Sequence, residues 1–143
     1  MDLSKFSKAA FLGPENSFSE MAKDEFCKKY GVIIQSVAFS TVKEVVDFVD
    51  KNSDALGVLP VENSIDGAMR EPLDTLTETQ NPYIRILSEI VMPIEYCLLS
   101  KTTEFYSITG VIASPRLMEK CNTFIKTELP RNLNIIEGST MND

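Results

Sequence analysis

Residues 55–67 read Ala-Leu-Gly-Val-Leu-Pro-Val-Glu-Asn-Ser-Ile-Asp-Gly, an apolar run that changes abruptly to polar and turn-forming residues. The apolar part can be buried on both faces of a parallel strand, whereas the residues from Glu62 onward cannot. The strand is therefore predicted to stop near Pro60, before a loop of hydrogen-bonding groups. Ligands of open α/β sheets bind beyond the carboxyl ends of the strands. We therefore expect residues 62–67 to form the floor of a small-molecule site.

The chain before this run alternates between strand patterns and helix patterns. Short apolar runs predict strands at residues 9–12 and 32–39, and helical spacing predicts helices that start at Ser17 and Thr41. Each of these starts has a Glu three residues later, which is capping-box spacing. The β-α-β-α-β order implies right-handed crossovers and a largely parallel sheet. The helix starts at Ser17, at Thr41 and near Ser64 should then lie at one edge of the sheet.

The two helices are expected to pack on the sheet through their apolar faces. The first is predicted to end at Gly31, since glycine commonly follows the last helical residue. Its inward face is predicted to carry Phe18, Met21, Ala22, Phe26 and Tyr30, and that of the second helix Val42, Val45, Val46 and Val49.

The stretch from Ile84 to Leu99 is rich in β-forming residues and is interrupted by Pro93. A central strand does not readily accept proline, so we predict two strands, or one strand that crosses between two lobes. A helix with proline in its first turn is predicted before it, from about Glu71. The lobe boundary follows: residues 1–93 form a first α/β lobe and residues 94–143 a partial second lobe.

The second lobe is predicted to contain two strands, at residues 111–113 and 133–136, joined by a helix. Ser114 and Pro115 are typical of the N-cap and first position of a helix. The last residues, 138–143, resemble another strand end followed by a helix cap. The predicted second lobe is therefore incomplete.

Composition is typical of a soluble globular protein, with 43% apolar and 24% charged residues. The net charge of −7 disfavours nucleic acid and anionic membrane surfaces as partners. The first residues lack the apolar core of a signal peptide, and no apolar run is long enough to span a bilayer. We therefore expect a cytoplasmic protein without nucleic-acid or membrane partners.

The cysteines and the absence of histidine limit the chemistry. Cys27, Cys97 and Cys121 are far apart and lack C-x-x-C spacing, so neither a disulfide framework nor a zinc site is predicted. Without histidine the chain lacks the usual general base, the His-paired nucleophiles and the commonest metal ligand. We therefore expect no metal site.

Polar residues at the predicted helix starts can bind an anion, because helix N-termini offer unpaired N–H groups and a partial positive charge. A Ser or Thr at such a position is more often only a cap, so binding depends on convergence at one edge. Glu62 is either an acid, a base or an orienting group, or a solvated carboxylate. Asn63 is either a bidentate hydrogen-bonding group or a turn residue.

Four segments, taken together, resemble the catalytic domain of prephenate dehydratases. They are Phe-Leu-Gly-Pro-Glu-Asn-Ser-Phe-Ser at residues 11–19, Leu-Pro-Val-Glu-Asn-Ser-Ile-Asp-Gly at 59–67, Ile-Glu-Tyr-Cys-Leu-Leu at 94–99, and the Ser-Pro segment at 114–121. The resemblance implies an α/β fold of two lobes, similar to type II periplasmic binding proteins, with substrate in the cleft. It also implies conversion of prephenate into phenylpyruvate, water and carbon dioxide in phenylalanine biosynthesis, without a metal or organic cofactor.

The resemblance also implies which residues contact the substrate. Prephenate carries two carboxylates, which suits a cleft lined by helix starts and by Ser and Asn side chains. The first lobe would contribute Ser17, Phe18, Glu62, Asn63 and Ser64. The second lobe would contribute Ser114, Ser139 and Thr140.

The chain departs from the family pattern at several places. Asn16 replaces a glycine, a mild change because asparagine tolerates positive φ. Tyr96 replaces a histidine, and Ala-Ser-Pro-Arg at residues 113–116 replaces Ser-His-Pro-Gln. The Thr-Arg-Phe motif, whose threonine the family uses in dehydration, does not occur, so no catalytic residue is identified. By the same resemblance we expect no regulatory ACT domain within these 143 residues.

Our leading hypothesis is that the chain is the N-terminal part of a prephenate dehydratase and has little activity alone. The shortening would result from truncation, from proteolysis or from the structure of the gene. The alternative is a catalytically silent module that binds or senses prephenate or another small carboxylate. A third possibility is that two chains complement each other, because a partial lobe leaves sheet edges and apolar helix faces unpaired. We therefore expect a homo-oligomer.

Overall fold

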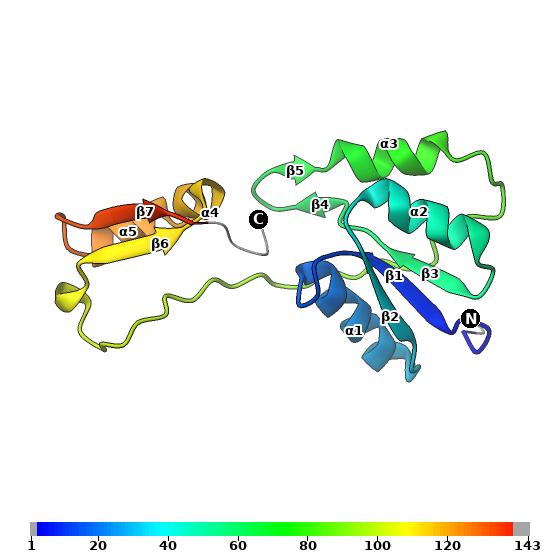
Figure 1. The fold of residues 1–143 in the computed structure, drawn as a ribbon, viewed down its shortest axis with the longest axis horizontal. Coiled ribbons are helices and arrows are strands. Elements are labelled where there is room, and N and C mark those ends of the chain that lie inside the picture. The colour runs from blue at the N-terminus through cyan, green and yellow to red at the C-terminus, as the bar shows by residue number, and fades with distance from the viewer. Residues whose placement is uncertain (1–2, 139–143) are drawn as a thin grey trace. The chain divides into compact units, whose positions relative to one another are not determined.

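The computed structural model describes residues 3–138. The chain divides into two compact units, Met1–Pro93 (unit 1) and Ile94–Asp143 (unit 2). Both combine parallel strands with helices, so the α/β class is confirmed (Figure 1). Among the described residues, no helix has the length and apolarity needed to cross a membrane.

Unit 1 is built on a three-stranded parallel sheet with the order β2-β1-β3 (Figure 1). The strands are β1 (Lys8–Leu12), β2 (Gln35–Phe39) and β3 (Ala55–Val58). The predicted strands are thus present, although β2 starts three residues later than Val32. Because β1 is central, its middle residues are almost fully buried, as expected for a parallel strand covered on both faces.

Two helices follow the first two strands, each started by a side-chain cap. Ser17 caps α1 (Phe18–Tyr30) and Thr41 caps α2 (Val42–Lys51), where the complete capping box is present. Gly31 ends α1 with φ of 65°, a left-handed conformation that glycine adopts at little cost. The helix starts and the first helix end are therefore as predicted.

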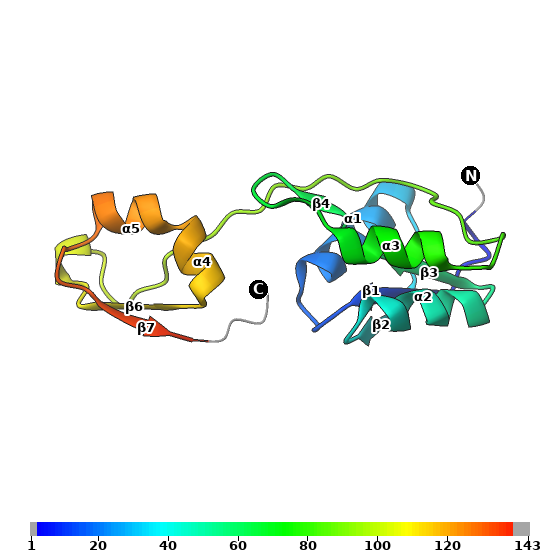
Figure 2. The same cartoon turned by 90° about the horizontal axis from the view of Figure 1, so that it is seen from above.

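The helices cover opposite faces of the sheet (Figure 2). Gly57 of β3 lies beside Ala10 of β1, and a Cβ at Gly57 would lie 3.1 Å from a methyl carbon of Val49 on α2. On the other face, the ammonium of Lys23 on α1 lies 6.0 Å from the ring centroid of Phe11. Consecutive residues of β1 are therefore buried under different helices.

The face of α1 that packs on the sheet differs from the predicted one. The buried residues of α1 are Ser19, Lys23 and Phe26, whereas Met21 is 51% exposed and Tyr30 is 38% exposed. Positions 19, 23 and 26 form a helical stripe with i, i+4, i+7 spacing. The prediction that Met21 and Tyr30 face inward is wrong, because the buried stripe is centred on a lysine.

Unit 1 continues beyond β3 into a short hairpin and a third helix. The hairpin pairs β4 (Glu62–Asn63) with β5 (Gly67–Ala68) in antiparallel fashion, where a loop was predicted. It is followed by α3 (Arg70–Glu78), which starts one residue before the predicted Glu71. The polar end of the 55–67 run is therefore a closed turn.

Residues 84–99 form no strand in the described structure, so the prediction of one or two strands there is wrong. A strand needs the backbone of a neighbour to pair with, whatever its side-chain pattern. Here the apolar side chains are exposed instead, including Ile86 (83%), Val91 (85%) and Leu99 (89%). A hydrogen bond links this segment to α1, between the hydroxyls of Tyr30 and Ser88, 3.2 Å apart.

Unit 2 contains a two-stranded parallel sheet, β6 (Gly110–Ala113) with β7 (Asn134–Glu137), after a short 3₁₀ helix, η1 (Phe105–Ser107). Two helices connect the strands, α4 (Pro115–Lys120) and α5 (Asn122–Glu128). One continuous helix was predicted, and the structure instead breaks it between α4 and α5.

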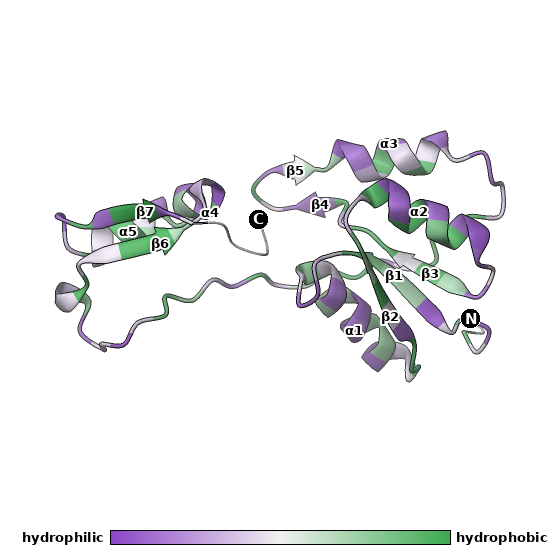
Figure 3. Cartoon of the chain, viewed as in Figure 1, coloured by the Kyte–Doolittle hydropathy of each residue, from purple (hydrophilic) through white to green (hydrophobic). Residues whose placement is uncertain are grey.

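The helix break at Cys121 and the exposed sheet both indicate that unit 2 buries little apolar surface. Cys121, between the helices, has φ of −93° and ψ of 4°, outside the helical region. All four residues of β7 are exposed, and the middle of the strand, which is formed by two isoleucines, is coloured as hydrophobic (Figure 3). The described buried apolar residues of unit 2 are Val111, Ala113 and Leu129.

Candidate functional site

The carboxyl edge of the unit 1 sheet carries an open hollow. Because the strands are parallel, β1, β2 and β3 end at the same edge, and α1, α2 and the hairpin all begin there (Figures 1 and 2). A hollow of about 320 Å³ lies beside the ends of β1 and β2, lined by Gly13, Pro14, Ala38, Phe39 and Ser40. This is the edge at which open α/β sheets bind ligands.

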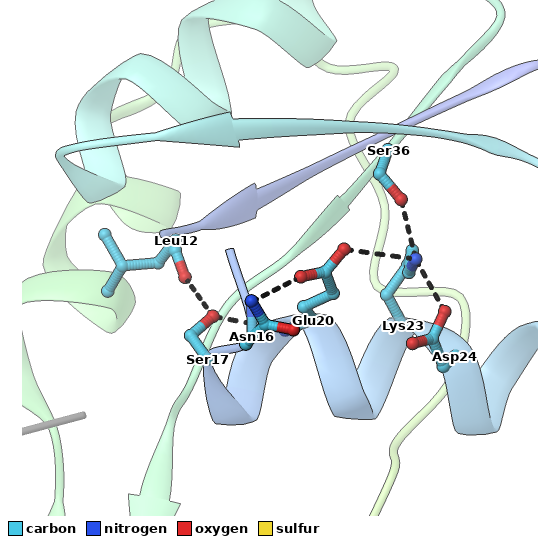
Figure 4. Close-up of polar contacts among 7 residues, drawn as sticks. All are labelled: Leu12, Asn16, Ser17, Glu20, Lys23, Asp24 and Ser36. Atoms are coloured by element: carbon cyan, nitrogen blue, oxygen red, sulfur yellow. Dashed lines mark hydrogen bonds and ion pairs between the residues drawn. The ribbon is translucent and has the colours of Figure 1, made fainter. Parts of the chain in front are cut away.

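The turn between β1 and α1 is held by Ser17 (Figure 4). The Ser17 hydroxyl donates to the carbonyl oxygen of Leu12 at 3.0 Å and accepts from the N–H of Glu20 at 3.3 Å. Ser17 is 6% exposed. Its hydroxyl therefore acts as a cap that links the start of α1 to the end of β1.

Asn16 has φ of 64°, the conformation that the replaced glycine would adopt freely. The N–H of Asn16 donates to Oε2 of Glu20 at 2.6 Å. Asparagine tolerates this conformation better than most residues. Asparagine at position 16 is therefore compatible with the left-handed conformation of this turn.

Lys23 belongs to the same cluster, and the sequence reasoning did not single it out. Its side chain is 8% exposed, and its ammonium lies 2.6 Å from the Ser36 hydroxyl, 2.6 Å from Oδ1 of Asp24 and 3.7 Å from Oε1 of Glu20 (Figure 4). The available signal was the 19-23-26 stripe, in which a lysine stands between Ser19 and Phe26. A lysine is ordinarily assigned to the solvent face, which hid it.

The hairpin carries the other predicted residues of unit 1. The side-chain oxygen of Asn63 accepts from the N–H groups of Ile65 at 3.0 Å and Asp66 at 2.8 Å, and its amide nitrogen donates to the carboxylate of Asp66 at 2.9 Å. Asn63 thus stabilises its own turn, which corresponds to the second of its two predicted roles, that of a turn residue. Glu62 and Ser64 are exposed on either side of it.

The described predicted residues fall into two groups. Ser17 and Phe18 at the start of α1 lie at the same end of unit 1 as Glu62, Asn63 and Ser64 of the hairpin (Figure 1). In unit 2, Ser114 is 3% exposed and its hydroxyl accepts from the N–H of Leu117 at 3.2 Å, capping α4. The predicted residues Ser139 and Thr140 lie outside the described residues.

The groups at the edge are suited to holding an anion through hydrogen bonds. They comprise a helix start, hydroxyls, an amide and the backbone of a tight turn. Nucleophilic chemistry is disfavoured at Cys27 on α1, because burial raises the pKa of its thiol and keeps it protonated. Within residues 3–138, no group of three or more His, Cys, Asp or Glu side chains is placed to hold a metal ion.

Comparison with known proteins agrees with the sequence motifs. A family model for prephenate dehydratase matches residues 9–142. The chain is 34% identical over 128 residues to a bifunctional chorismate mutase/prephenate dehydratase of Buchnera aphidicola subsp. Schizaphis graminum (strain Sg), covering 88% of this chain and 31% of that protein. It is 31% identical over 137 residues to a protein of the same description from Aquifex aeolicus (strain VF5), covering 96% and 36%.

The match is extensive on this chain and partial on its relatives. The chain spans about a third of the length of the curated relatives named above. No solved structure gives a significant match. Because the family model covers nearly all of the 143 residues, including both the Ser17 turn and the hairpin, the chain belongs to the prephenate dehydratase family.

Proposed function

We propose that this chain carries part of a prephenate-binding site and acts in the dehydration of prephenate to phenylpyruvate, water and carbon dioxide, a step of phenylalanine biosynthesis. Membership of the family supports the reaction class. The observation that carries the proposal is that the α1 start and the β4–β5 hairpin both lie at the carboxyl edge of the sheet (Figure 1). The same edge has a hollow where β1 and β2 end. We also propose a cytoplasmic location, as for a biosynthetic enzyme.

The chemistry of prephenate suits this edge. Prephenate carries two carboxylates, and helix N-termini bind anions through backbone N–H groups without a basic side chain. This is valuable in a chain with a net charge of −7. We propose that Ser17, Phe18, Glu62, Asn63 and Ser64 contact one end of the substrate from unit 1. Ser114, Ser139 and Thr140 are proposed to contact it from unit 2, in a two-lobed fold of the type II periplasmic-binding-protein kind.

Turnover is proposed to be weak for these 143 residues alone. Expulsion of the ring hydroxyl needs a group that donates a proton to it, while a carboxylate leaves as carbon dioxide. The sequence contains neither histidine nor the Thr-Arg-Phe motif. We therefore expect the purified chain to form phenylpyruvate only slowly. Efficient phenylpyruvate formation by this chain would contradict this part of the proposal.

The test of the site is a calorimetric titration of the chain with prephenate. Asn63→Ala and Ser64→Ala should each weaken binding by about 1 to 3 kcal/mol, through loss of hydrogen bonds at the site. Asn81→Ala is the matched control, since the side chain of Asn81 also accepts from the backbone two residues on, at Tyr83, outside the proposed site. Unchanged affinity in both hairpin variants, or an equal loss in the control, would reject the hairpin as a prephenate-binding element.

A binding or sensing module is the second candidate. The absence of histidine from the whole sequence favours it, because binding needs no proton donor. If the chain binds prephenate but forms no phenylpyruvate, either as a monomer or as an oligomer, the binding module would be favoured over the enzyme.

A homo-oligomer is proposed for either function. The apolar side chains exposed on β7 and on residues 84–99 support it. Light scattering that shows a monomer at high concentration would contradict it.

A further inference from the structure

Lys23 is a buried cation surrounded by protein acceptors. It is 6% exposed on the face of α1 that packs on the sheet, and burial of an ammonium is strongly unfavourable unless the charge is paired. Here the ammonium contacts a hydroxyl on β2 (Ser36) and the carboxylates of Asp24 and Glu20 (Figure 4). Two acceptors, on Ser36 and Asp24, lie at hydrogen-bond distance from the ammonium, and the Glu20 carboxylate forms an ion pair with it at 3.7 Å, so we treat Lys23 as a structural cation and not as a direct ligand for an anion.

Glu20 connects Lys23 to the turn before α1. Its two carboxylate oxygens have different partners: Oε1 lies 3.7 Å from the Lys23 ammonium, and Oε2 accepts from the N–H of Asn16 at 2.6 Å. The Glu20 side chain is 19% exposed, so the nearby cation contributes more than it would at the surface. Because Asn16 has positive φ, its conformation depends on such external hydrogen bonds.

We propose that Lys23 is a positioning residue for the binding turn, defined as residues 13–18. Anchored on Ser36 of the sheet, Lys23 orients Glu20, Glu20 holds the N–H of Asn16, and Asn16 sets the direction from which Ser17 and the first turn of α1 meet the substrate. The inference rests on the proposed function, since it assigns the binding turn a contact with prephenate. It adds a residue that acts through others and does not itself touch the ligand.

The main test compares Lys23→Met with Lys23→Arg. Methionine has a similar length without charge, whereas arginine retains the cation. Amide hydrogen exchange is measured by NMR at Asn16 and Glu20 in the ligand-free chain, and the prephenate dissociation constant is measured by calorimetry. In Lys23→Met we expect exchange at both amides to be about tenfold faster and prephenate binding about tenfold weaker. Lys23→Arg should restore most of both.

Two further variants separate positioning from general stability. Lys43→Met is the matched control, because Lys43 is also paired on a helix, with Asp47 on α2, but its side chain is 73% exposed. It should change neither measurement. Ser36→Ala removes the anchor from an exposed position of β2 without altering α1, and it should accelerate exchange at the same two amides by a smaller factor.

Three outcomes would overturn the inference. They are unchanged exchange at Asn16 and Glu20 in Lys23→Met, a uniform acceleration over α1 and β1 that reflects loss of global stability, and faster local exchange with unchanged prephenate affinity. If the parent chain binds no prephenate, the proposed function fails and the binding half of the inference fails with it. The exchange data then still decide whether Lys23 holds the turn, so the two failures are distinguishable.

Discussion

The two units use the same local design with different results. In each, a parallel strand leads into a helix capped by a serine hydroxyl, at Ser17 in unit 1 and Ser114 in unit 2. In unit 1, β1 has a neighbour on either side and helices on both faces, and Phe11 is 0% exposed. In unit 2, β6 and β7 are both edge strands, and Ile112 and Ile135 are 69% and 60% exposed.

The difference shows that position in the sheet determines burial more than side-chain type does. Isoleucine is as apolar as any residue of β1, yet it stays exposed where no element covers it. A two-stranded sheet is marginal by itself, whereas three strands packed on helices form an independent core. Unit 1 should therefore contribute most of the stability of the chain, and unit 2 should open more easily.

The largest expected effect compares one apolar residue of each sheet. Phe11→Ala should lower the free energy of unfolding by about 3 to 5 kcal/mol, because it removes a fully buried ring and leaves a cavity. Ile135→Ala on the exposed β7 should cost less than about 1 kcal/mol. Urea unfolding followed by circular dichroism measures both. Similar losses for the two substitutions would mean that β7 is covered in solution, as in an oligomer.

Amide hydrogen exchange provides a second comparison without mutation. Amides in the middle of β1, such as Ala10, should exchange at least about a hundredfold more slowly than those of β7, since β1 opens only with the core of unit 1. Mass spectrometry of peptides covering residues 8–12 and 134–137 measures the ratio. Equal protection of the two peptides would show that the two sheets open together, and it would contradict the claim that unit 1 is the more stable unit.

Helix capping gives a smaller effect. Thr41→Ala removes the capping box of α2 and should cost about 1 kcal/mol in the unfolding of unit 1. Ser114→Ala removes the corresponding cap of α4, and it should leave the melting of unit 1 unchanged if the units unfold separately. Differential scanning calorimetry resolves the transitions. A shift of the unit 1 transition in Ser114→Ala would indicate that the two units unfold cooperatively.

The smallest expected effect depends on pH. The hydrogen bond from Ser7, with one from Lys8, holds the pKa of Asp54 below its usual value. A carboxyl group with a lowered folded pKa stabilises the fold above its unfolded pKa, and that contribution is lost as the pH falls through the folded value. As the pH is lowered from about 5 to about 3, the melting temperature of the parent chain should therefore fall more than that of Asp54→Asn.

Asp74→Asn on α3 is the control for this experiment, because it removes one negative charge elsewhere in unit 1. It should keep the steeper dependence of the parent chain. An identical pH profile in the parent chain and Asp54→Asn would exclude a stabilising role for the Ser7 and Lys8 contacts.

Features set by local sequence were predicted well. The caps at Ser17 and Thr41 and the glycine end at Gly31 each depend on residues within one helical turn, and the structure has all three. The strands at residues 84–99 depend on a neighbour that sequence periodicity cannot identify, and there the prediction is wrong. The break at Cys121 was missed because the apolar spacing continues across it.

The candidate site divides in the same way. Ser17 and Asn63 were identified from motifs, and the structure gives both a cap or turn role that spacing alone had left open. Lys23 was missed because its environment is created by Ser36 on β2 and by Glu20 together. The charged members of this cluster are close in sequence, but the burial of Lys23 depends on the packing of α1 on the sheet, so in the sequence alone they look like ordinary surface charges.

Gly57 restricts the size of the side chains that can be packed between α2 and β3. A Cβ at this position would meet methyl carbons of Val49 at 3.1 Å and Val45 at 3.5 Å, so α2 rests almost directly on the backbone of β3. In a library randomised at positions 49 and 57, the folded members should show inversely related side-chain sizes, for example Gly57→Ala together with Val49→Ala. The two positions would then covary although they lie on different elements, α2 and β3.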